Sequence, residues 1–482
     1  MTTALDMVIR NADVATASER FRADIGISAG TIVALGTELP QGREEIDALG
    51  RLVTPGGVDA HCHLDQPMTD GSKMADDFVS GTRSAACGGT TTVIPFACQL
   101  QGQTLGDAID DYHRRADGQA AIDYAFHLII SDPTPHALHT ELPALIERGY
   151  TSFKVYMTYD DMKLNDRQIL EVLAVARREG AMTMIHAENS DCIAWLTDQL
   201  LAAGLTAPRF HASARPMLVE REATHRALAL AELADVPVLI VHVSGREAVE
   251  QIRTAQGNGL RVFGETCPQY LFLTADDLAA DGFEGAKCIC SPPPRDRANQ
   301  EVIWRGLTNG TFQVFSSDHA PFAYAGSAGK QMAGREAPFS RVPNGIPGLE
   351  TRLPLLYSHG VAAGRIDVHT FVALTSTNAA RIYGLFPRKG TIAIGSDADI
   401  VIWNTGIAMT IQNAQLHHAV DYTPYEGLPV NAWPGVTVSR GTVVWRDGQY
   451  VGSPGHGKFL RCDRPAPAQA RGHGHVVPFA RG

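Results

Sequence analysis

Eight apolar runs of strand length recur through the middle of this chain, and segments with a helical pattern, such as 166–178 and 220–233, lie between most of them. Strands that alternate with helices build parallel sheets, and eight repeats of this kind favour a closed (β/α)8 barrel of the TIM type. An open doubly wound sheet would more often carry an early Gly-x-Gly-x-x-Gly turn, which this sequence lacks. The predicted fold class is therefore α/β. The eight runs are 53–60, 91–97, 122–130, 151–157, 182–188, 236–244, 261–266 and 312–318.

A second, smaller domain is predicted from the two ends of the chain, where short apolar-polar alternations are separated by turn residues. They occupy 7–10, 22–27 and 31–35, and again 390–395, 399–403, 436–438 and 442–445. Two β-rich ends around a different middle indicate that the termini meet in one β-sandwich domain. The predicted limits are 1–52 and 386–462 for the β-sandwich domain, 53–385 for the barrel, and 463–482 for a flexible tail or inter-subunit arm rich in Pro, Gly and Ala.

The bulk composition restricts the class of partner. A chain of 482 residues with 44% hydrophobic and 19% charged residues is typical of a globular protein, and its net charge of -11 disfavours nucleic acid or an anionic membrane surface. No apolar run approaches membrane-spanning length, and no secretory signal is visible. The eight cysteines form no Cys-x-x-Cys pair and are expected to be free thiols in a reducing compartment, so a cytoplasmic protein is predicted.

Metal-binding side chains stand where several of the predicted strands end. His61 and His63 are two positions apart, so an extended strand points both to one face. His186, His242 and Asp318 occupy matching places on other strands. One such histidine alone would more often be an ordinary polar or core residue. Because the chemistry of a (β/α)8 barrel lies at the carboxyl ends of its strands, the whole set favours a metal site.

Lys154 lies inside an apolar run, where a bare ammonium group is costly and cannot bind a metal ion. One interpretation is a structural ion pair with Asp318 or Glu188. The other is that carbon dioxide carboxylates the amine, which gives an anionic carbamate whose two oxygens can bridge two divalent cations. The histidines nearby favour the second interpretation and therefore a binuclear site.

Motifs distributed over most of the chain point to one family. They occupy 56–65, 75–78, 86–91, 153–157, 186–188, 265–270, 290–293, 317–321, 343–345, 378–381 and 397–401. With so many matches in register, the sequence resembles the cyclic amidohydrolases of the dihydropyrimidinase and hydantoinase family, within the amidohydrolase superfamily. The resemblance implies two divalent ions, zinc or alternatively manganese, bridged by a carboxylated Lys154, and a homotetramer or dimer. It also implies that one ion is held by His61, His63 and Asp318, and the other by His186 and His242.

The resemblance assigns further roles around the ions. Tyr159 stands where the family has a tyrosine that hydrogen-bonds the developing oxyanion, and the backbone groups of Ser291 and Asn344 would hold the amide and imide edges of a ring. Asp318 would act as the proton shuttle as well as a ligand. The predicted pocket mouth, which would contact the ring substituent, consists of Met68, Tyr156 and Met162.

The predicted activity is hydrolysis of the ring amide C–N bond in dihydropyrimidines or 5-substituted hydantoins, which yields N-carbamoyl amino acids. Similar dihydroorotases have an arginine where this chain has Asp65, so a neutral ring is favoured over one that carries a carboxylate. Allantoinase and cyclic-imide hydrolase remain alternatives within the family. A non-catalytic scaffold homologue is disfavoured because every ligand position is filled, and deaminases or deacetylases with one metal usually lack the lysine. His417, His418 and His211 are expected to be surface or packing residues. His473 and His475, in the tail, repeat the His-x-His spacing without a strand and are not expected to form a metal site.

Overall fold

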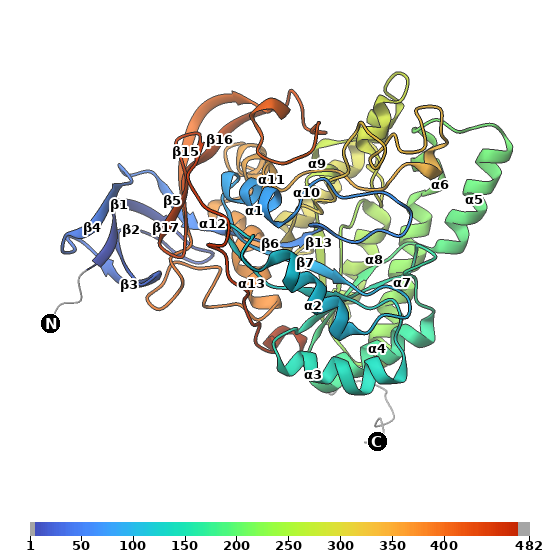
Figure 1. Ribbon diagram of the computed structural model, residues 1–482, viewed down its shortest axis with the longest axis horizontal. Helices are drawn as coiled ribbons and strands as arrows, with labels where there is room; N and C mark the ends of the chain where they lie inside the picture. Colours follow the sequence, from blue (N-terminus) through green and yellow to red (C-terminus); the bar gives the residue numbers. More distant parts are fainter. Residues whose placement is uncertain (1–4, 471–482) are drawn as a thin grey trace.

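The computed structural model of the protein describes residues 5–470 and contains two β-sheets, one closed into a barrel and one built from both ends of the chain. In Figure 1 the blue N-terminal strands lie beside the red C-terminal strands, to the left of the barrel and its helices. The predicted α/β fold class, a barrel with a smaller β domain from both termini, is confirmed.

The barrel strands run parallel, and all but one follow each other around the barrel in chain order. The exception, β8, pairs with β7 and forms a bridge to Phe459. A parallel bridge between Cys62 and His319 joins the first strand to the segment after the last one. Each predicted apolar run overlaps at least one of these strands, and 122–130 contains both β8 and β9, because strands buried on both faces read as continuous apolar stretches. The strands are β6 (Gly57–Cys62), β7 (Thr90–Cys98), β8 (Asp123–Tyr124), β9 (His127–Ile129), β10 (Ser152–Tyr156), β11 (Met182–His186), β12 (Val238–Ile240), β13 (Val262–Thr266) and β14 (Val314–Phe315).

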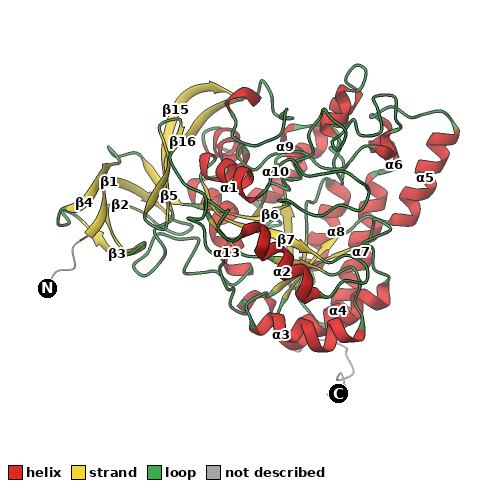
Figure 2. Cartoon of the chain, viewed as in Figure 1, coloured by secondary structure: helices red, strands yellow, loops and turns green. Residues whose placement is uncertain are grey.

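Helices cover the outside of the barrel, as Figure 2 shows in red. The helix at Asp166–Glu179 illustrates why: Asn165 and Gln168 form a capping box at its start, and Gly180 ends it with a φ of 70°. Its apolar residues recur at helical spacing and are buried. The helices are α1 (Phe78–Cys87), α2 (Leu105–Ala116), α3 (Leu142–Glu147), α4 (Asp166–Glu179), α5 (Ser190–Ala202), α6 (Phe210–Ala214), α7 (Met217–Ala234), α8 (Arg246–Gly257), α9 (Gln269–Phe272), α10 (Arg297–Thr308), α11 (Arg352–Leu356), α12 (Val368–Val372) and α13 (Asn378–Ile382).

The terminal sheet joins both ends of the chain through β5, which pairs in parallel with β1 and antiparallel with β15. Two details differ from the sequence prediction. The run 390–395 is not a strand, because Gly390 and Gly395 have φ values of 85° and 93°, outside the extended region. A polar strand, β4, was not predicted. The strands of this sheet are β1 (Leu5–Ala15), β2 (Arg20–Ser28), β3 (Thr31–Gly36), β4 (Gly42–Asp47), β5 (Leu52–Pro55), β15 (Ile400–Thr410), β16 (Pro429–Ser439), β17 (Thr442–Arg446) and β18 (Gln449–Tyr450).

A buried cluster of charges ties the barrel to the terminal sheet. The Lys389 amine is fully buried and lies 2.6 Å from Asp123 in β8, 3.0 Å from Asp397 and 2.7 Å from Asp399. Arg440 also pairs with Asp123, at 2.8 Å. Since removing one partner from a buried charge cluster leaves the others uncompensated, these contacts help to fix the two sheets relative to each other.

The described part of the C-terminal segment lies against the barrel. Arg464 pairs with Glu147 and Glu179, the residues that end α3 and α4, and Ala468 is buried. His473 and His475 lie outside the described residues. The exact domain limits stay a prediction.

All eight cysteines are free, and all but Cys192 are buried. Among residues 5–470, no helix combines the length and the apolar character needed to cross a lipid bilayer.

Candidate metal centre and active site

The five predicted histidine and aspartate ligands all lie at the carboxyl ends of barrel strands. His61 and His186 are within the last two residues of β6 and β11, whereas His63, His242 and Asp318 follow their strands closely. His242 and Asp318 have φ values of 38° and 47°. Few residues other than glycine adopt this left-handed conformation, and those that do are frequent at functional sites.

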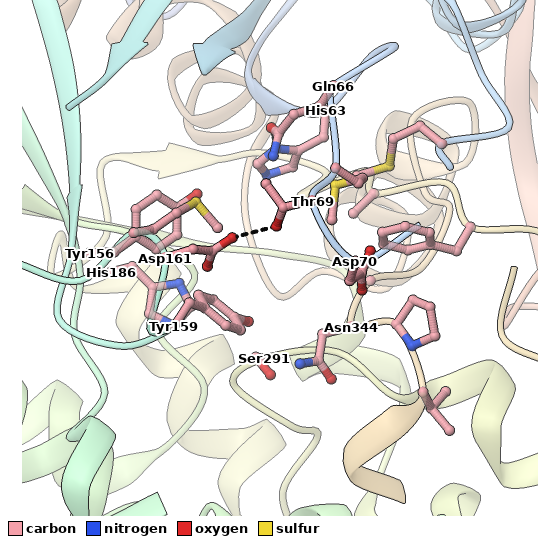
Figure 3. Close-up of a pocket in the computed structure, with 18 of the residues that line it drawn as sticks. His63, Gln66, Thr69, Asp70, Tyr156, Tyr159, Asp161, His186, Ser291 and Asn344 are labelled. Carbon is pink, nitrogen blue, oxygen red and sulfur yellow. Dashed lines mark hydrogen bonds between the residues drawn. The ribbon is translucent and has the colours of Figure 1, made fainter. Parts of the chain in front are cut away.

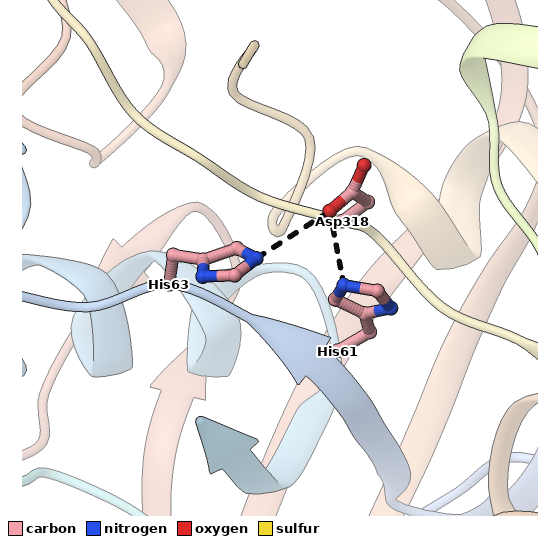
Figure 4. A group of neighbouring side chains, drawn as sticks. All are labelled: His61, His63 and Asp318. Atoms are coloured by element: carbon pink, nitrogen blue, oxygen red, sulfur yellow. Dashed lines mark ion pairs between the residues drawn. The ribbon is translucent and has the colours of Figure 1, made fainter. Parts of the chain in front are cut away.

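The first group of ligands converges on one point (Figure 4). Oδ1 of Asp318 lies 3.1 Å from Nε2 of His61 and 3.6 Å from Nε2 of His63, and one potential ligand atom from each residue lies within 4.8 Å of the others. A second pair stands beside it: Nδ1 of His186 and Nε2 of His242 are 2.9 Å apart. The rings of His61 and His242 are 5.3 Å apart, so the two groups are neighbours.

The outward nitrogens of the first two histidines are held by acceptors. Nδ1–H of His61 donates to Oε1 of Glu265 at 2.6 Å, and Nδ1–H of His63 donates to Oε1 of Gln66 at the same distance. Each contact leaves Nε2 bare and directed at Asp318. This is the arrangement that orients metal-binding histidines and strengthens them as ligands.

In the second pair an acceptor holds the outward nitrogen of His186, whereas Nδ1 of His242 has no hydrogen-bond partner among the described residues. Nε2–H of His186 donates to Oε2 of Glu188 at 2.8 Å, and Glu188 in turn accepts from Arg215 at 2.8 Å. The backbone N–H of His242 donates to Oε1 of Glu265 at 3.1 Å, so this carboxylate contacts residues of both groups. Burial lowers the pKa of His186. Burial alone would raise the pKa of Glu188, but its contacts with Arg215 and His186 outweigh that effect and hold the pKa of Glu188 at about 2.

Lys154, in β10, lies between the two groups. Its Nζ is 2.8 Å from Nε2 of His61 and sits over the rings of Phe96 and Tyr156, at 4.4 and 4.9 Å from their centroids. Within the described chain it forms no ion pair with a carboxylate, which removes the structural ion pair as an explanation of its burial. Burial lowers the pKa of Lys154 to about 8, and an amine without its proton is the form that reacts with carbon dioxide.

The donor set fits two divalent ions. Burial lowers the pKa of His63 to about 4 and that of His242 well below its usual value, so both imidazoles are neutral, as ligands must be. Imidazole nitrogens and one carboxylate suit zinc. Four neutral histidines and one aspartate carry a single negative charge, which is little for two divalent cations. A carboxylated Lys154 would add two anionic oxygens.

A cavity of about 370 Å³ opens above these ligands (Figure 3). Tyr159, Ser291 and Asn344 line it, and Oγ of Ser291 and Oδ1 of Asn344 are buried with no hydrogen-bond partner among the described residues. Buried polar atoms are nearly always paired, so these two are free to contact a ligand. Burial raises the pKa of Tyr159 to about 12, which keeps its hydroxyl protonated and able to donate near neutral pH. The φ of Tyr159 is 68°, again in the left-handed region.

The three residues expected at the pocket mouth, Met68, Tyr156 and Met162, also line this cavity. Their contact with a ring substituent stays a prediction. Asp65 does not line the cavity; it pairs with Arg115 at 2.9 Å. Its negative charge is therefore neutralised outside the pocket and does not act on a substrate directly.

Comparison with other proteins agrees with this geometry. A model of the amidohydrolase family matches residues 52–444. The chain belongs to the amidohydrolase family. It is 43% identical to the D-hydantoinase of Ralstonia pickettii, over 95% of this chain and 99% of that protein, and 46% identical to the D-hydantoinase of Geobacillus stearothermophilus, over 94% and 96%. Among solved structures, dihydropyrimidinase from Brevibacillus agri NCHU1002 superposes with a TM-score of 0.93 at 43% identity, over 95% of this chain and 99% of that one.

The amidohydrolase family is generally binuclear, and His61, His63 and Asp318 form a group that could hold a metal ion. A second group of metal-capable side chains, Cys87, Glu350 and His417, does not line the cavity, and its glutamate is already occupied by hydrogen bonds within the protein. Glu350 accepts from Ser84, from the backbone N–H of His417 and from its Nδ1–H, while the thiol of Cys87 stays protonated because burial raises its pKa. His418 bonds Asn413, so neither histidine of this pair reaches the centre.

Sequence reasoning missed the supporting residues of this amidohydrolase site. Glu265 is the penultimate residue of β13. A search for polar residues at strand ends, which selected the predicted ligands, would therefore also have found Glu265. His319, within the motif 317–321, was given no role. Its Nε2–H donates to Asp76 at 3.2 Å and its Nδ1 accepts from the backbone N–H of Gly348, which fixes the residue next to Asp318. His211 is a packing residue, since it is buried and its Nε2–H donates to the carbonyl of Cys290 at 2.8 Å.

Proposed function

We propose that this protein is a binuclear-metal cyclic amidohydrolase that opens the ring amide C–N bond of dihydropyrimidines or 5-substituted hydantoins to give N-carbamoyl amino acids. One observation carries the proposal: a buried amine without a carboxylate partner, Lys154, stands between two groups of metal-capable side chains at the floor of the cavity. The D-hydantoinases and the dihydropyrimidinase that match nearly the whole chain support the choice of substrate class.

The residues that would hold the ions follow from the site. His61, His63 and Asp318 would bind one ion, His186 and His242 the other, and a carboxylated Lys154 would bridge them; zinc is favoured and manganese is the alternative. Two such ions would supply the Lewis acidity that lowers the pKa of a water molecule and polarises a ring carbonyl.

The chain's own residues would then perform the proton transfers and hold the ring. Asp318 would accept a proton from the attacking water and deliver it to the leaving ring nitrogen. The Tyr159 hydroxyl would donate to the carbonyl oxygen as it gains negative charge, a contribution of about 3 kcal/mol when the donor is already positioned. Ser291 and Asn344 would hold the amide and imide edges of the ring.

We also propose that the protein is a cytoplasmic homotetramer or dimer. Two large apolar side chains, Trp195 of α5 and Leu218 of α7, are 63% and 50% exposed, and contact with a second subunit would remove them from water. The seven buried free thiols suit a reducing compartment. Light scattering coupled to size-exclusion chromatography would give the mass of the assembly, and a monomer would contradict this part of the proposal.

A panel of cyclic amides, assayed with purified protein whose metal content has been measured, tests the activity. The protein is prepared with zinc and bicarbonate. We expect ring opening of dihydrouracil and 5-benzylhydantoin, with little turnover of allantoin, succinimide and dihydroorotate. Fast turnover of allantoin or succinimide alone would favour the allantoinase or cyclic-imide alternative, and no turnover of any ring by metal-loaded protein would refute the proposal.

A further inference from the structure

A second buried lysine lies beside the cavity, in the long segment that follows β14. The side chain of Lys330 is almost completely buried, with 1% of the residue exposed. Its amine donates to two backbone carbonyls, those of Ile289 and Pro343, each at 2.7 Å. Within residues 5–470 it forms no ion pair.

The two carbonyls belong to the segments that carry the ring-binding residues. Ile289 precedes Ser291 by two positions, and Pro343 immediately precedes Asn344. The carbonyl of Ile289 also accepts the backbone N–H of Gly345 at 3.0 Å. One lysine amine and one backbone amide therefore tie the two segments together directly behind the side chains that face the cavity. Figure 3 shows Ser291 and Asn344 at the same end of the pocket.

The cost of burying this amine argues against a packing role. Burial lowers the pKa of Lys330 to about 7, because no carboxylate contacts the ammonium group to compensate for its lost hydration. An apolar side chain such as methionine would fill the same space without that cost. What methionine lacks is hydrogen-bond donors, and a lysine amine provides one for each carbonyl whether it is protonated or neutral.

The backbone of Lys330 also helps to hold the neighbouring part of the cavity wall. Its backbone N–H donates to the carbonyl of Ala323 at 2.7 Å, and Met332 and Ala333, which follow it closely, line the cavity. Gly329 permits this approach, since a Cβ there would lie 2.1 Å from the carbonyl oxygen of Ala323. Residue 330 is therefore held through both its backbone and its side chain.

We propose that Lys330 is a positioning residue that sets the spacing between Ser291 and Asn344, and through it the orientation of the cyclic amide held between them. The inference rests on the proposed function, and it extends that function to a residue that touches neither metal nor substrate. An error of about 1 Å in the placement of a bound group lowers the rate of an enzyme by about 100-fold, so a loosened pair should be visible in kinetics.

The test compares Lys330→Met with the wild-type protein and with Lys287→Met. Lys287 is a partly exposed lysine nearby that pairs with Glu284 at 2.6 Å and contacts neither carbonyl. For each protein, KM and kcat for 5-benzylhydantoin, zinc content and thermal unfolding are measured. For Lys330→Met we expect a KM raised about 10-fold or more, with a smaller change in kcat and zinc content equal to wild type. Lys287→Met should match the wild type in all four.

A purely structural lysine would lower the unfolding temperature and leave the KM of the folded protein unchanged, which would overturn the inference. If Lys330→Met does not fold, Lys330→Gln replaces it, since this polar side chain is one atom shorter and cannot reach both carbonyls at once. A raised KM then supports the inference and a wild-type KM overturns it. A wild-type protein that opens no ring would instead refute the proposed function, so the two failures are distinguishable.

Discussion

Glu265→Gln is the most direct test of how the metal centre is organised. The substitution keeps the size of the side chain and one carbonyl-type oxygen, and it removes only the negative charge. That charge lies 2.6 Å from Nδ1 of His61 and 3.1 Å from the backbone nitrogen of His242. Both predicted ion sites should therefore lose affinity, because one carboxylate orients a ligand from each group.

The expected magnitude follows from the contacts. A hydrogen bond to a charged group contributes about 1.5–3 kcal/mol of free energy. Each ~1.4 kcal/mol corresponds to a factor of ten in an equilibrium constant. The dissociation constant for zinc should rise about 10-fold to 100-fold, in the range found for supporting carboxylates of other metal sites. Turnover at saturating zinc should recover much of the wild-type value, because Glu265 does not line the cavity.

The assay is a zinc titration of metal-depleted protein against a chromophoric chelator, followed by turnover at saturating zinc. Glu350→Gln is the matched control, since Glu350 is also a buried glutamate that accepts from a histidine, His417, at 2.9 Å, but remote from the cavity. The control should bind zinc like the wild type. Wild-type zinc affinity in Glu265→Gln would refute the view that this carboxylate supports the centre.

Three other substitutions test separate parts of the site and the fold. Asp318→Asn removes the proton acceptor, so we expect nearly complete loss of turnover with an unchanged circular dichroism spectrum. Lys154→Met cannot form the carbamate, so zinc content measured by mass spectrometry should fall below two ions per chain and bicarbonate should not restore it. Lys389→Met leaves buried carboxylates uncompensated and should lower the free energy of unfolding in urea by about 3–5 kcal/mol at pH 7. Burial raises the pKa of Asp123, but Lys389 and Arg440 hold it below its usual 3.8, so the stability from this pairing is present above that pH and is lost as the pH falls below it. The deficit of Lys389→Met should therefore shrink in acid, and an equal deficit at every pH would contradict this explanation.

The barrel was predictable because its strands are buried on both faces and each stands out as an apolar run between helical segments. The terminal sheet was harder to delimit. β4 contains Arg43, Glu44 and Glu45 on an edge of that sheet, and an edge strand rich in exposed charge gives no apolar pattern. The run 390–395 has the alternation of a strand, but glycines at both of its ends adopt positive φ, which the pattern of apolar residues does not reveal.

The site was predictable to the extent that chemistry follows strand ends. His61, His186 and Asp318 could be selected because parallel strands bring their carboxyl ends to one face of the barrel. Lys330 gave no such signal, since its partners are the backbone carbonyls of Ile289 and Pro343, 41 and 13 residues away, and a backbone acceptor leaves no mark in the sequence.

The backbone at the site explains why side chains from separate strands can converge so closely. Tyr159, His242 and Asp318 have φ values of 68°, 38° and 47°, and each such residue costs about 1–3 kcal/mol and persists only where its surroundings impose the conformation. Here the surroundings do so: Glu265 holds the backbone N–H of His242, and His319 anchors the segment of Asp318 to Asp76. A strand that continued straight would point alternate side chains to opposite faces of the sheet. At His242 and Asp318 a left-handed residue just past the strand end breaks this alternation, so the strain and the buried contacts that maintain it are part of how the centre is assembled.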